Sequence, residues 1–135
     1  MMMSAERLQA LFAPQLAQVT QLCRQVEALV LCTEDGLSLA TSGVSAEQVN
    51  ALAAVASSLM VLSDNSFDAF GHSGSAERLL LESGHGTVII QRLRIKQRSL
   101  FLMARSREAQ LGVVIMAVSK GAAAIEAKFM ESFTV

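Results

Sequence analysis

A long segment without charge restricts how this chain can fold. No charged residue occurs between Glu47 and Asp64, and the residues between them are mostly Ala, Leu, Val and Ser. Small or apolar residues recur there at helical spacing and define one face of a helix: Val49, Leu52, Ala53, Ala56, Leu59, Met60, Ser63 and Phe67. The opposite face is small or apolar as well: Ala51, Ala54, Ser58 and Val61. Such a helix is covered on more than one side, either as the central helix of its own domain or by packing against a second subunit.

Local signals mark both ends of this helix. Ser45-Ala46-Glu47-Gln48 has the pattern of a capping box, which places Ser45 at the N-cap and Gln48 at the third helical position. The helix should run to about Phe70, because a glycine-containing loop at residues 71–75 follows it. The sequence therefore predicts a helix over residues 45–70.

Short apolar runs on both sides of this helix are typical of strands. Residues 29–33 and 37–41 are separated by Glu34-Asp35-Gly36. An Asp-Gly pair between apolar runs is a strong hairpin signal, because Gly accepts the positive φ of the turn. Three further strands are expected after the helix: residues 78–83, 87–94 and 99–104.

The two ends of the chain are expected to be helical. Residues 4–26 carry apolar positions at intervals of three and four, but Pro14 interrupts them and predicts either a kink or two helices. Residues 111–118 are compatible with a buried strand by propensity alone. Helical spacing nevertheless continues through the Ala-rich residues that follow, which favours one helix over residues 109–132.

Together these elements predict an α+β fold. Its five-stranded antiparallel sheet has helices on both faces, in the order α-β-β-α-β-β-β-α. A chain of 135 residues has the size of one domain. We expect a helical extension over residues 1–19 and a single domain over residues 20–135.

Composition excludes several classes of protein. A formal net charge of −1 and the absence of Trp and Tyr argue against a nucleic-acid partner, which needs a basic field and stacking side chains. Hydrophobic residues make up 52% and charged residues 17%, which favours either an oligomer or an Ala-rich core. The start lacks a signal peptide, and the longest apolar run, Leu111–Val118, is too short to span a membrane. We therefore expect a cytoplasmic protein.

No constellation of residues points to catalysis, a metal or a cofactor. His72 and His85 lie in glycine-containing turns without a second ligand at metal-binding spacing. Cys23 and Cys32 form no Cys-x-x-Cys pair, and Cys32 falls in the middle of a strand, where a thiol is usually inert. Nucleotide-binding glycine motifs and a nucleophile elbow are absent. The sequence predicts a non-enzymatic protein.

Four stretches in a fixed order resemble a known family. They are residues 26–37, the small-residue helix after Ser45, residues 77–90, and Gln110-Leu-Gly-Val-Val114. The chain resembles the Roadblock/LC7 family, of the bacterial or archaeal type and with a profilin-like architecture. The resemblance implies a homodimer in which strand 78–83 pairs with its twin and helix 45–70 packs beside its twin. The candidate interface residues are Leu79, Leu80, Leu81, Ala51, Ala54, Ser58 and Val61.

The same resemblance implies a regulator or scaffold in signalling that binds a Ras-like small GTPase. A basic cluster is the candidate partner contact, although such a cluster is often only a solvated hairpin end: Arg92, Arg94, Lys96 and Arg98. The alternative is a small-ligand sensor, with Thr33, Ser57 and Ser58 as polar groups in its pocket. A small hydrolase is disfavoured, since no nucleophile is paired with a base.

Overall fold

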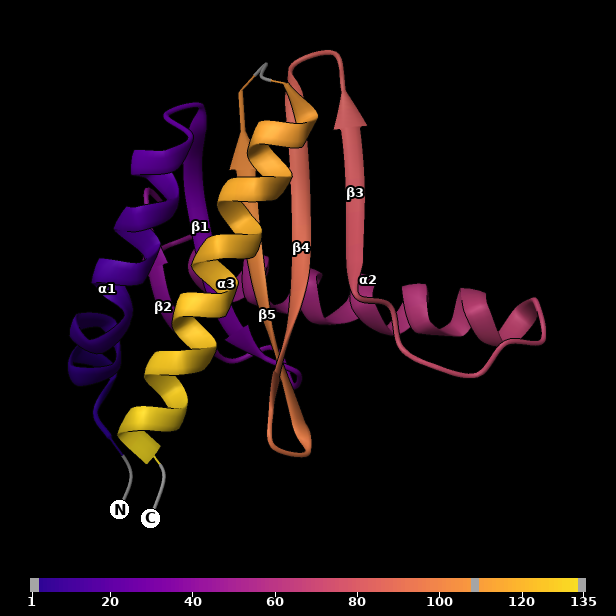
Figure 1. Ribbon diagram of the computed structural model, residues 1–135, viewed down its shortest axis with the longest axis horizontal. Coiled ribbons are helices and arrows are strands. Elements are labelled where there is room, and N and C mark those ends of the chain that lie inside the picture. Colours follow the sequence, from indigo (N-terminus) through magenta and orange to yellow (C-terminus); the bar gives the residue numbers. More distant parts are fainter. Residues whose placement is uncertain (1–2, 108–109, 134–135) are drawn as a thin grey trace.

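The computed structural model describes residues 3–107 and 110–133, and these form one antiparallel sheet with helices on both faces (Figure 1). The elements follow the expected order: α1 (Ala5–Leu22), β1 (Val26–Thr33), β2 (Ser38–Ser42), α2 (Val49–Ala69), β3 (Arg78–Ser83), β4 (Gly86–Ile95), β5 (Arg98–Ser106) and α3 (Leu111–Phe133). The strands are arranged β2-β1-β5-β4-β3. The predicted fold class is confirmed.

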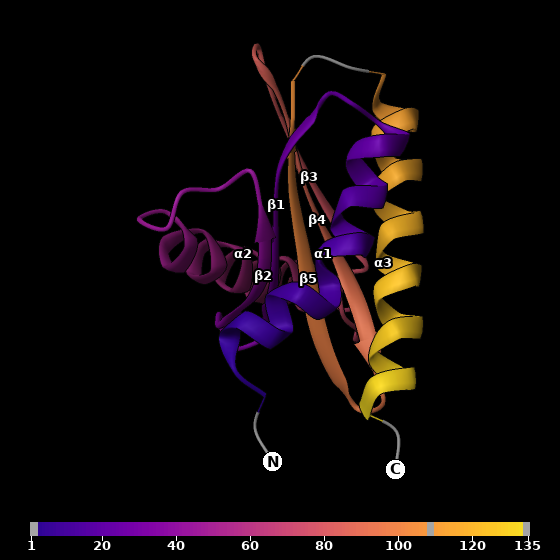
Figure 2. The same cartoon turned by 90° about the vertical axis from the view of Figure 1, so that its left-hand side faces the viewer.

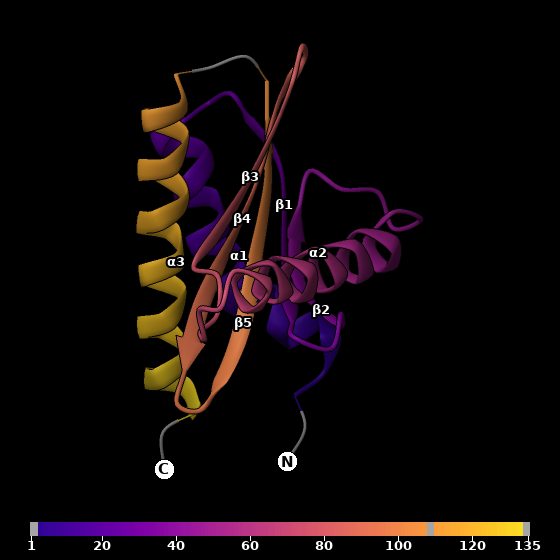
Figure 3. The ribbon, with the colours of Figure 1, turned by 90° about the vertical axis from the view of Figure 1, so that its right-hand side faces the viewer.

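The helices divide between the two faces of the sheet. Helices α1 and α3 lie together on one face, and α2 crosses the other face alone (Figures 2 and 3). Each face has its own hydrophobic core. The core under α1 and α3 includes Phe12, Leu16, Leu93 and Ile125. The core under α2 includes Ala53, Met60, Ile90 and Phe101.

The β1–β2 hairpin forms where its turn residues predicted it. Gly36 has a φ of +86°, a conformation that favours glycine. The Gly36 N–H donates to the Thr33 carbonyl at 3.0 Å, and the Leu37 N–H donates to the Thr33 hydroxyl at 3.0 Å. This local network closes the turn.

The N-terminal segment is one helix containing Pro14, and Figure 2 shows it bending along its length. The helix ends at Leu22, before the predicted position, because Val26 already opens β1. Phe12, Leu16 and Val19 are fully or almost fully buried. The helix thus passes through residue 19 without interruption, and the division of the chain at that residue stays a prediction.

The predicted capping box at the start of α2 is wrong. Ser45 does not cap the helix: α2 begins at Val49, and the residue at its N-cap, Gln48, makes no side-chain capping bond. The Gln48 N–H donates instead to the Ser45 carbonyl at 3.0 Å, which closes a separate turn. At the other end, the His72 N–H donates to the Phe67 carbonyl at 2.9 Å beside Gly71 at φ +84°, so the loop ends the helix as expected.

The ambiguous C-terminal segment is one helix from Leu111 to Phe133, and residue 109, where the helix was expected to begin, lies outside the described residues. Its buried residues keep a spacing of three and four: Val114, Ala117, Val118, Gly121, Ala122 and Ile125. Burial of this face against the sheet and α1 outweighs the weak helix propensity of the β-branched residues near its start.

Candidate functional site

Strand β3 is an edge strand with no partner on its outer side among the described residues. Its inner side pairs with β4 along its whole length. The Arg92 N–H donates to the Glu77 carbonyl at 2.9 Å, so the alternation of an antiparallel ladder turns every second residue of β3 outward. The residues whose backbone N–H and C=O groups face the free edge are Arg78, Leu80 and Glu82. An edge of this kind can accept another strand.

Apolar side chains lie on both faces of the strand that forms this free edge. Leu79 packs against the core under α2, and Leu81 lies on the same face of the strand. Leu80 points to the opposite face, where it neighbours Ile89. Leu80 is 38% exposed and Leu81 42% exposed, so each leaves part of its apolar side chain uncovered. Both faces of β3 therefore present apolar surface.

The outward face of α2 is uncovered. Ala53, Ala56 and Met60 are buried against the sheet. The four residues expected to meet a second subunit are all exposed: Ala51, Ala54, Ser58 and Val61. This surface has no charge, so a protein partner could cover it without burying a charged group.

The C-terminal end of α2 projects beyond β3 (Figure 1). Apolar side chains on this projecting end are well exposed: Leu62, Phe67 and Phe70. Phe67 shares a helix face with the buried Met60, as its spacing predicted, but it is exposed because the helix has passed the edge of its own sheet there. The uncovered strand edge and the uncovered helix thus lie at the same side of the molecule.

Arg92 is buried and holds α2 on the sheet. Its guanidinium Nη2 lies 3.0 and 2.9 Å from the two carboxylate oxygens of Asp64 on α2. Its Nε donates to the Ala76 carbonyl at 2.7 Å, and its Nη1 donates to the Ser99 hydroxyl at 2.8 Å. The guanidinium also lies over the Phe101 ring. Arg92 is only 8% exposed, so its expected role as a partner contact is corrected.

The other three basic residues are exposed at the β4–β5 end of the sheet. Arg94 pairs with Glu77 and donates to the Ser75 hydroxyl. Arg98 lies 3.8 Å from Glu34, a loose and solvated pair. Lys96 makes no ion pair or hydrogen bond within the part of the chain that the structure describes. Sequence reasoning could not separate Arg92 from these three, because its partner Asp64 lies far away in the chain.

The residues with catalytic potential are isolated from one another. Burial raises the pKa of the Cys32 thiol to about 12. His72 and His85 are exposed in their turns. Within residues 3–107 and 110–133, no group of His, Cys, Asp and Glu side chains could hold a metal ion. None of the helices there is long and apolar enough to cross a membrane.

The polar residues expected in a ligand pocket do not converge. The Ser57 hydroxyl donates to the Glu34 carbonyl at 2.6 Å, and Ser58 is exposed on the outer face of α2. Only Thr33 reaches a cavity.

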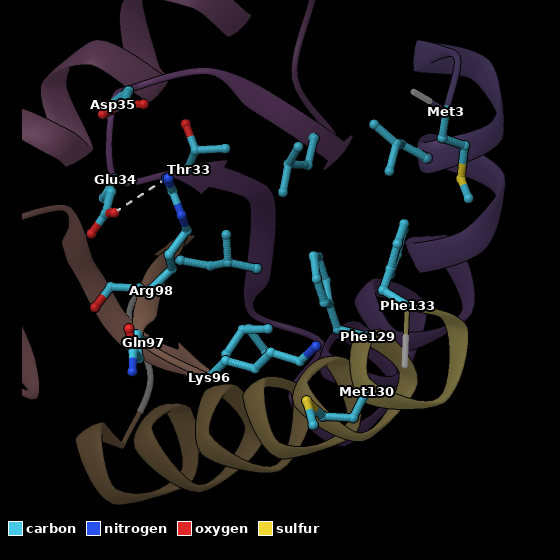
Figure 4. Close-up of a pocket in the computed structure, with 15 residues that line it drawn as sticks. Met3, Thr33, Glu34, Asp35, Lys96, Gln97, Arg98, Phe129, Met130 and Phe133 are labelled. Atoms are coloured by element: carbon cyan, nitrogen blue, oxygen red, sulfur yellow. Dashed lines mark ion pairs between the residues drawn. The ribbon is translucent and has the colours of Figure 1, made fainter. Parts of the chain in front are cut away.

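That cavity has a volume of about 780 Å³ and lies where the start of α1, the end of α3 and the β1–β2 and β4–β5 turns meet (Figure 4). Its apolar lining includes Leu8, Leu39, Ile95, Leu100, Phe129 and Phe133. Charged residues stand at its mouth: Glu34, Asp35, Lys96 and Arg98. No lining residue comes from α2 or β3. Sequence reasoning missed this site, although Phe129 and Phe133 stand one helical turn apart.

Comparison with known proteins gives a consistent result. A family model described as the Roadblock/LC7 domain matches residues 15–94, more than half of the chain. A search of curated proteins found no match.

Several solved structures share the fold. A Roadblock/LC7 domain from Streptomyces avermitilis is 20% identical, with a TM-score of 0.69 over 82% of this chain and 93% of that chain. Myxococcus xanthus MglB is 11% identical, with a TM-score of 0.72 over 97% and 95%. The gliding protein MglB from Thermus thermophilus is 12% identical, with a TM-score of 0.71 over 90% and 93%.

Proposed function

Because the chain belongs to the Roadblock/LC7 family, we propose that it is a homodimeric regulator or scaffold that binds a Ras-like small GTPase in the cytoplasm. It has no catalytic activity of its own in this proposal and changes the activity or the location of its partner. The observation that carries the proposal is the coincidence of an unpaired β3 edge and an uncovered, charge-free α2 face at one side of the molecule.

Pairing of two β3 edges would give hydrogen-bond partners to the backbone N–H and C=O groups that face outward from β3. Two copies of β3 related by a twofold axis join their sheets into one, with the outward groups of Leu80 bonded across the junction. The projecting end of α2 then lies over the sheet of the twin. Its exposed side chains, Leu62 and Phe67 among them, become covered by apolar surface of the twin.

Apolar burial supplies the driving force for this dimer. Full burial of one large aliphatic side chain contributes about 1.5–3 kcal/mol, and half-exposed residues such as Leu81 and Val61 gain roughly half of that. Several such residues on each subunit offset the entropy cost of association, which is on the order of 10 kcal/mol.

The partner surface in this proposal combines the part of α2 that the twin leaves exposed with the three exposed basic residues Arg94, Lys96 and Arg98. Their charges suit an acidic patch on the GTPase. The absence of a catalytic role is supported by the protonated state of the buried Cys32 thiol and by the isolation of both histidines.

Light scattering during gel filtration tests the dimer. We expect twice the chain mass at micromolar concentration for the natural protein. Leu80→Asp and Ala54→Glu each place a carboxylate in the interface, which costs several kcal/mol and should give monomers. Leu37→Asp is the matched control, since Leu37 is exposed in the β1–β2 turn, outside the interface. A natural protein that runs as a monomer would contradict the proposal, as would two variants that remain dimers.

Binding to the Ras-like GTPase encoded nearest to this gene tests the partner. The GTPase is titrated in its GDP form and with a non-hydrolysable GTP analogue. We expect the dimer to bind one nucleotide state more tightly and to change the rate of GTP turnover or the distribution of the GTPase. No binding in either state at tens of micromolar would contradict the regulatory role while leaving the dimer intact.

A further inference from the structure

The cavity at the end of the sheet is a preformed apolar site. Phe129 is held between two other rings, with centroids 5.8 Å from Phe12 and 4.5 Å from Phe133. These contacts hold the aromatic wall of the hollow in place. A volume of about 780 Å³ lies within the range of sites for small organic molecules.

The charged residues at the mouth differ in whether they have an ion-pair partner. Glu34 and Arg98 face each other across 3.8 Å and largely offset one another. Lys96 lies apart from them and extends toward α3 and the Phe129 side of the cavity (Figure 4). It has no ion pair or hydrogen bond among the described residues, and its backbone φ of +57° is one that few lysines adopt. One unpaired ammonium group therefore stands beside an apolar hollow.

We propose that this cavity binds an amphipathic carboxylate, with its hydrocarbon chain against Phe129, Phe133 and Leu39 and its carboxylate at the Lys96 ammonium group. The hydrocarbon gains from leaving water, and the carboxylate stays at the wet mouth, where pairing with Lys96 needs no deep burial of charge. This site is separate from α2 and β3 and goes beyond the proposed GTPase-binding role.

The acid left at the mouth selects the head group. Glu34 is offset by Arg98, whereas Asp35 lines the same opening and repels an anion more strongly as the charge of that anion increases. A phosphate monoester carries about −1.5 to −2 charges at neutral pH, whereas a carboxylate carries one. A single lysine offsets one negative charge, so the site favours a monocarboxylate over a phosphate ester with the same chain.

Titration with decanoate, followed by NMR of the methyl groups, tests this site. We expect saturable shifts at Ile95, Leu39 and Met130 and none on the outer face of α2. Lys96→Asn removes the charge and accepts the positive φ, and it should weaken decanoate binding about two- to five-fold, as for an exposed ion pair. Lys120→Ala, on the exposed side of α3, is the matched control and should not change the affinity.

Two other probes separate the tail from the head group. Decanol should bind the natural protein and Lys96→Asn equally, and decyl phosphate should bind the natural protein more weakly than decanoate does. The Leu80→Asp variant should bind decanoate with unchanged affinity, because the cavity lies outside the proposed dimer interface.

Three results would overturn the assignment. Absence of shifts at the lining methyl groups would remove the site. Equal affinity of the natural protein and Lys96→Asn for decanoate would remove the role of Lys96. Tighter binding of decyl phosphate would show that the head group is wrong. Dimerisation and GTPase binding are measured in separate experiments without decanoate, because Lys96 and Arg98 belong both to the mouth of the cavity and to the proposed GTPase contact.

Discussion

Asp64 and Arg92 form an ion pair that joins α2 to β4, with the Arg92 Nη2 3.0 and 2.9 Å from the two carboxylate oxygens. The Asp64 carboxylate also accepts the Ala76 N–H at 2.6 Å. One carboxylate thus fixes both the far half of α2 and the chain that leads into β3. This pair sets how the two uncovered elements lie relative to each other.

Loss of Asp64 should destabilise the fold. In Asp64→Ala the Arg92 guanidinium stays buried without its counter-ion, which we expect to cost about 2–3 kcal/mol, since Asp64 itself is partly exposed. Urea unfolding measures the change. Arg94→Met is the control, because the Arg94–Glu77 pair is exposed and should contribute less than about 1 kcal/mol. An equal loss of unfolding free energy in both variants would contradict the proposed role of the Asp64–Arg92 pair in holding α2 on the sheet.

Two glycines of α3 should respond in opposite ways to the same change. A Cβ at Gly121 would overlap the Val19 Cγ2, and Val19 is a stiff side chain packed between α1 and α3. Gly121→Ala should therefore destabilise the protein by about 1–3 kcal/mol. Gly112→Ala meets nothing within 4 Å and should stabilise it by up to about 1 kcal/mol through helix propensity. Thermal unfolding compares the two, and stabilisation by both would show that α1 and α3 are not closely packed there.

Stability should fall at alkaline pH because of Cys32. Its thiol titrates near its ordinary pKa of 9.0 in the unfolded chain but at about 12 in the folded protein. Between these values the unfolded chain loses a proton that the folded protein keeps, so stability decreases as pH rises from 9 to 12. Raising the pH from about 8 to about 10 should cost roughly 1 kcal/mol more in the natural protein than in Cys32→Val. Parallel pH profiles of the two proteins would exclude this linkage.

Charge reversal at the β4–β5 turn should separate partner binding from dimerisation. Lys96→Glu and Arg98→Glu should weaken GTPase binding, mainly through a slower association rate that is sensitive to salt, while light scattering still reports a dimer. Glu47→Lys, at an exposed position before α2, is a control that alters charge elsewhere on the surface. If both reversals bind like the natural protein at low salt, the GTPase contacts a different surface.

Local signals were sufficient for most of the fold. The turn at Asp35-Gly36 was predictable because the hydrogen bonds that close it, from the N–H groups of Gly36 and Leu37 to Thr33, are local. The helix in the last segment was predictable because its buried positions repeat with a helical period over many residues. The prediction of Ser45 as the N-cap was wrong because a capping box and a separate turn can begin with the same residue types. Here Ser45 opens a turn, and the helix begins only at Val49.

The functional surfaces were only partly predictable, because they depend on contacts between distant segments. The charge-free face of α2 could be found in the sequence, but not that its own domain leaves this face uncovered. The burial of Arg92 did not, since four neighbouring basic residues look alike until Asp64 and Ser99 are placed beside one of them. The cavity is formed by two helix ends and two turns, and no local pattern shows that these meet.

Hydrogen exchange at the Leu80 amide tests the central claim, that two copies join through β3, most directly. This N–H points away from β4 and has a partner only if a second strand lies beside it. We expect slow exchange at micromolar concentration, and fast exchange both at high dilution and in Ala54→Glu, while the Leu79 amide on the inner side stays slow throughout. Fast exchange at Leu80 in a sample that light scattering shows to be dimeric would contradict the claim and place the interface elsewhere.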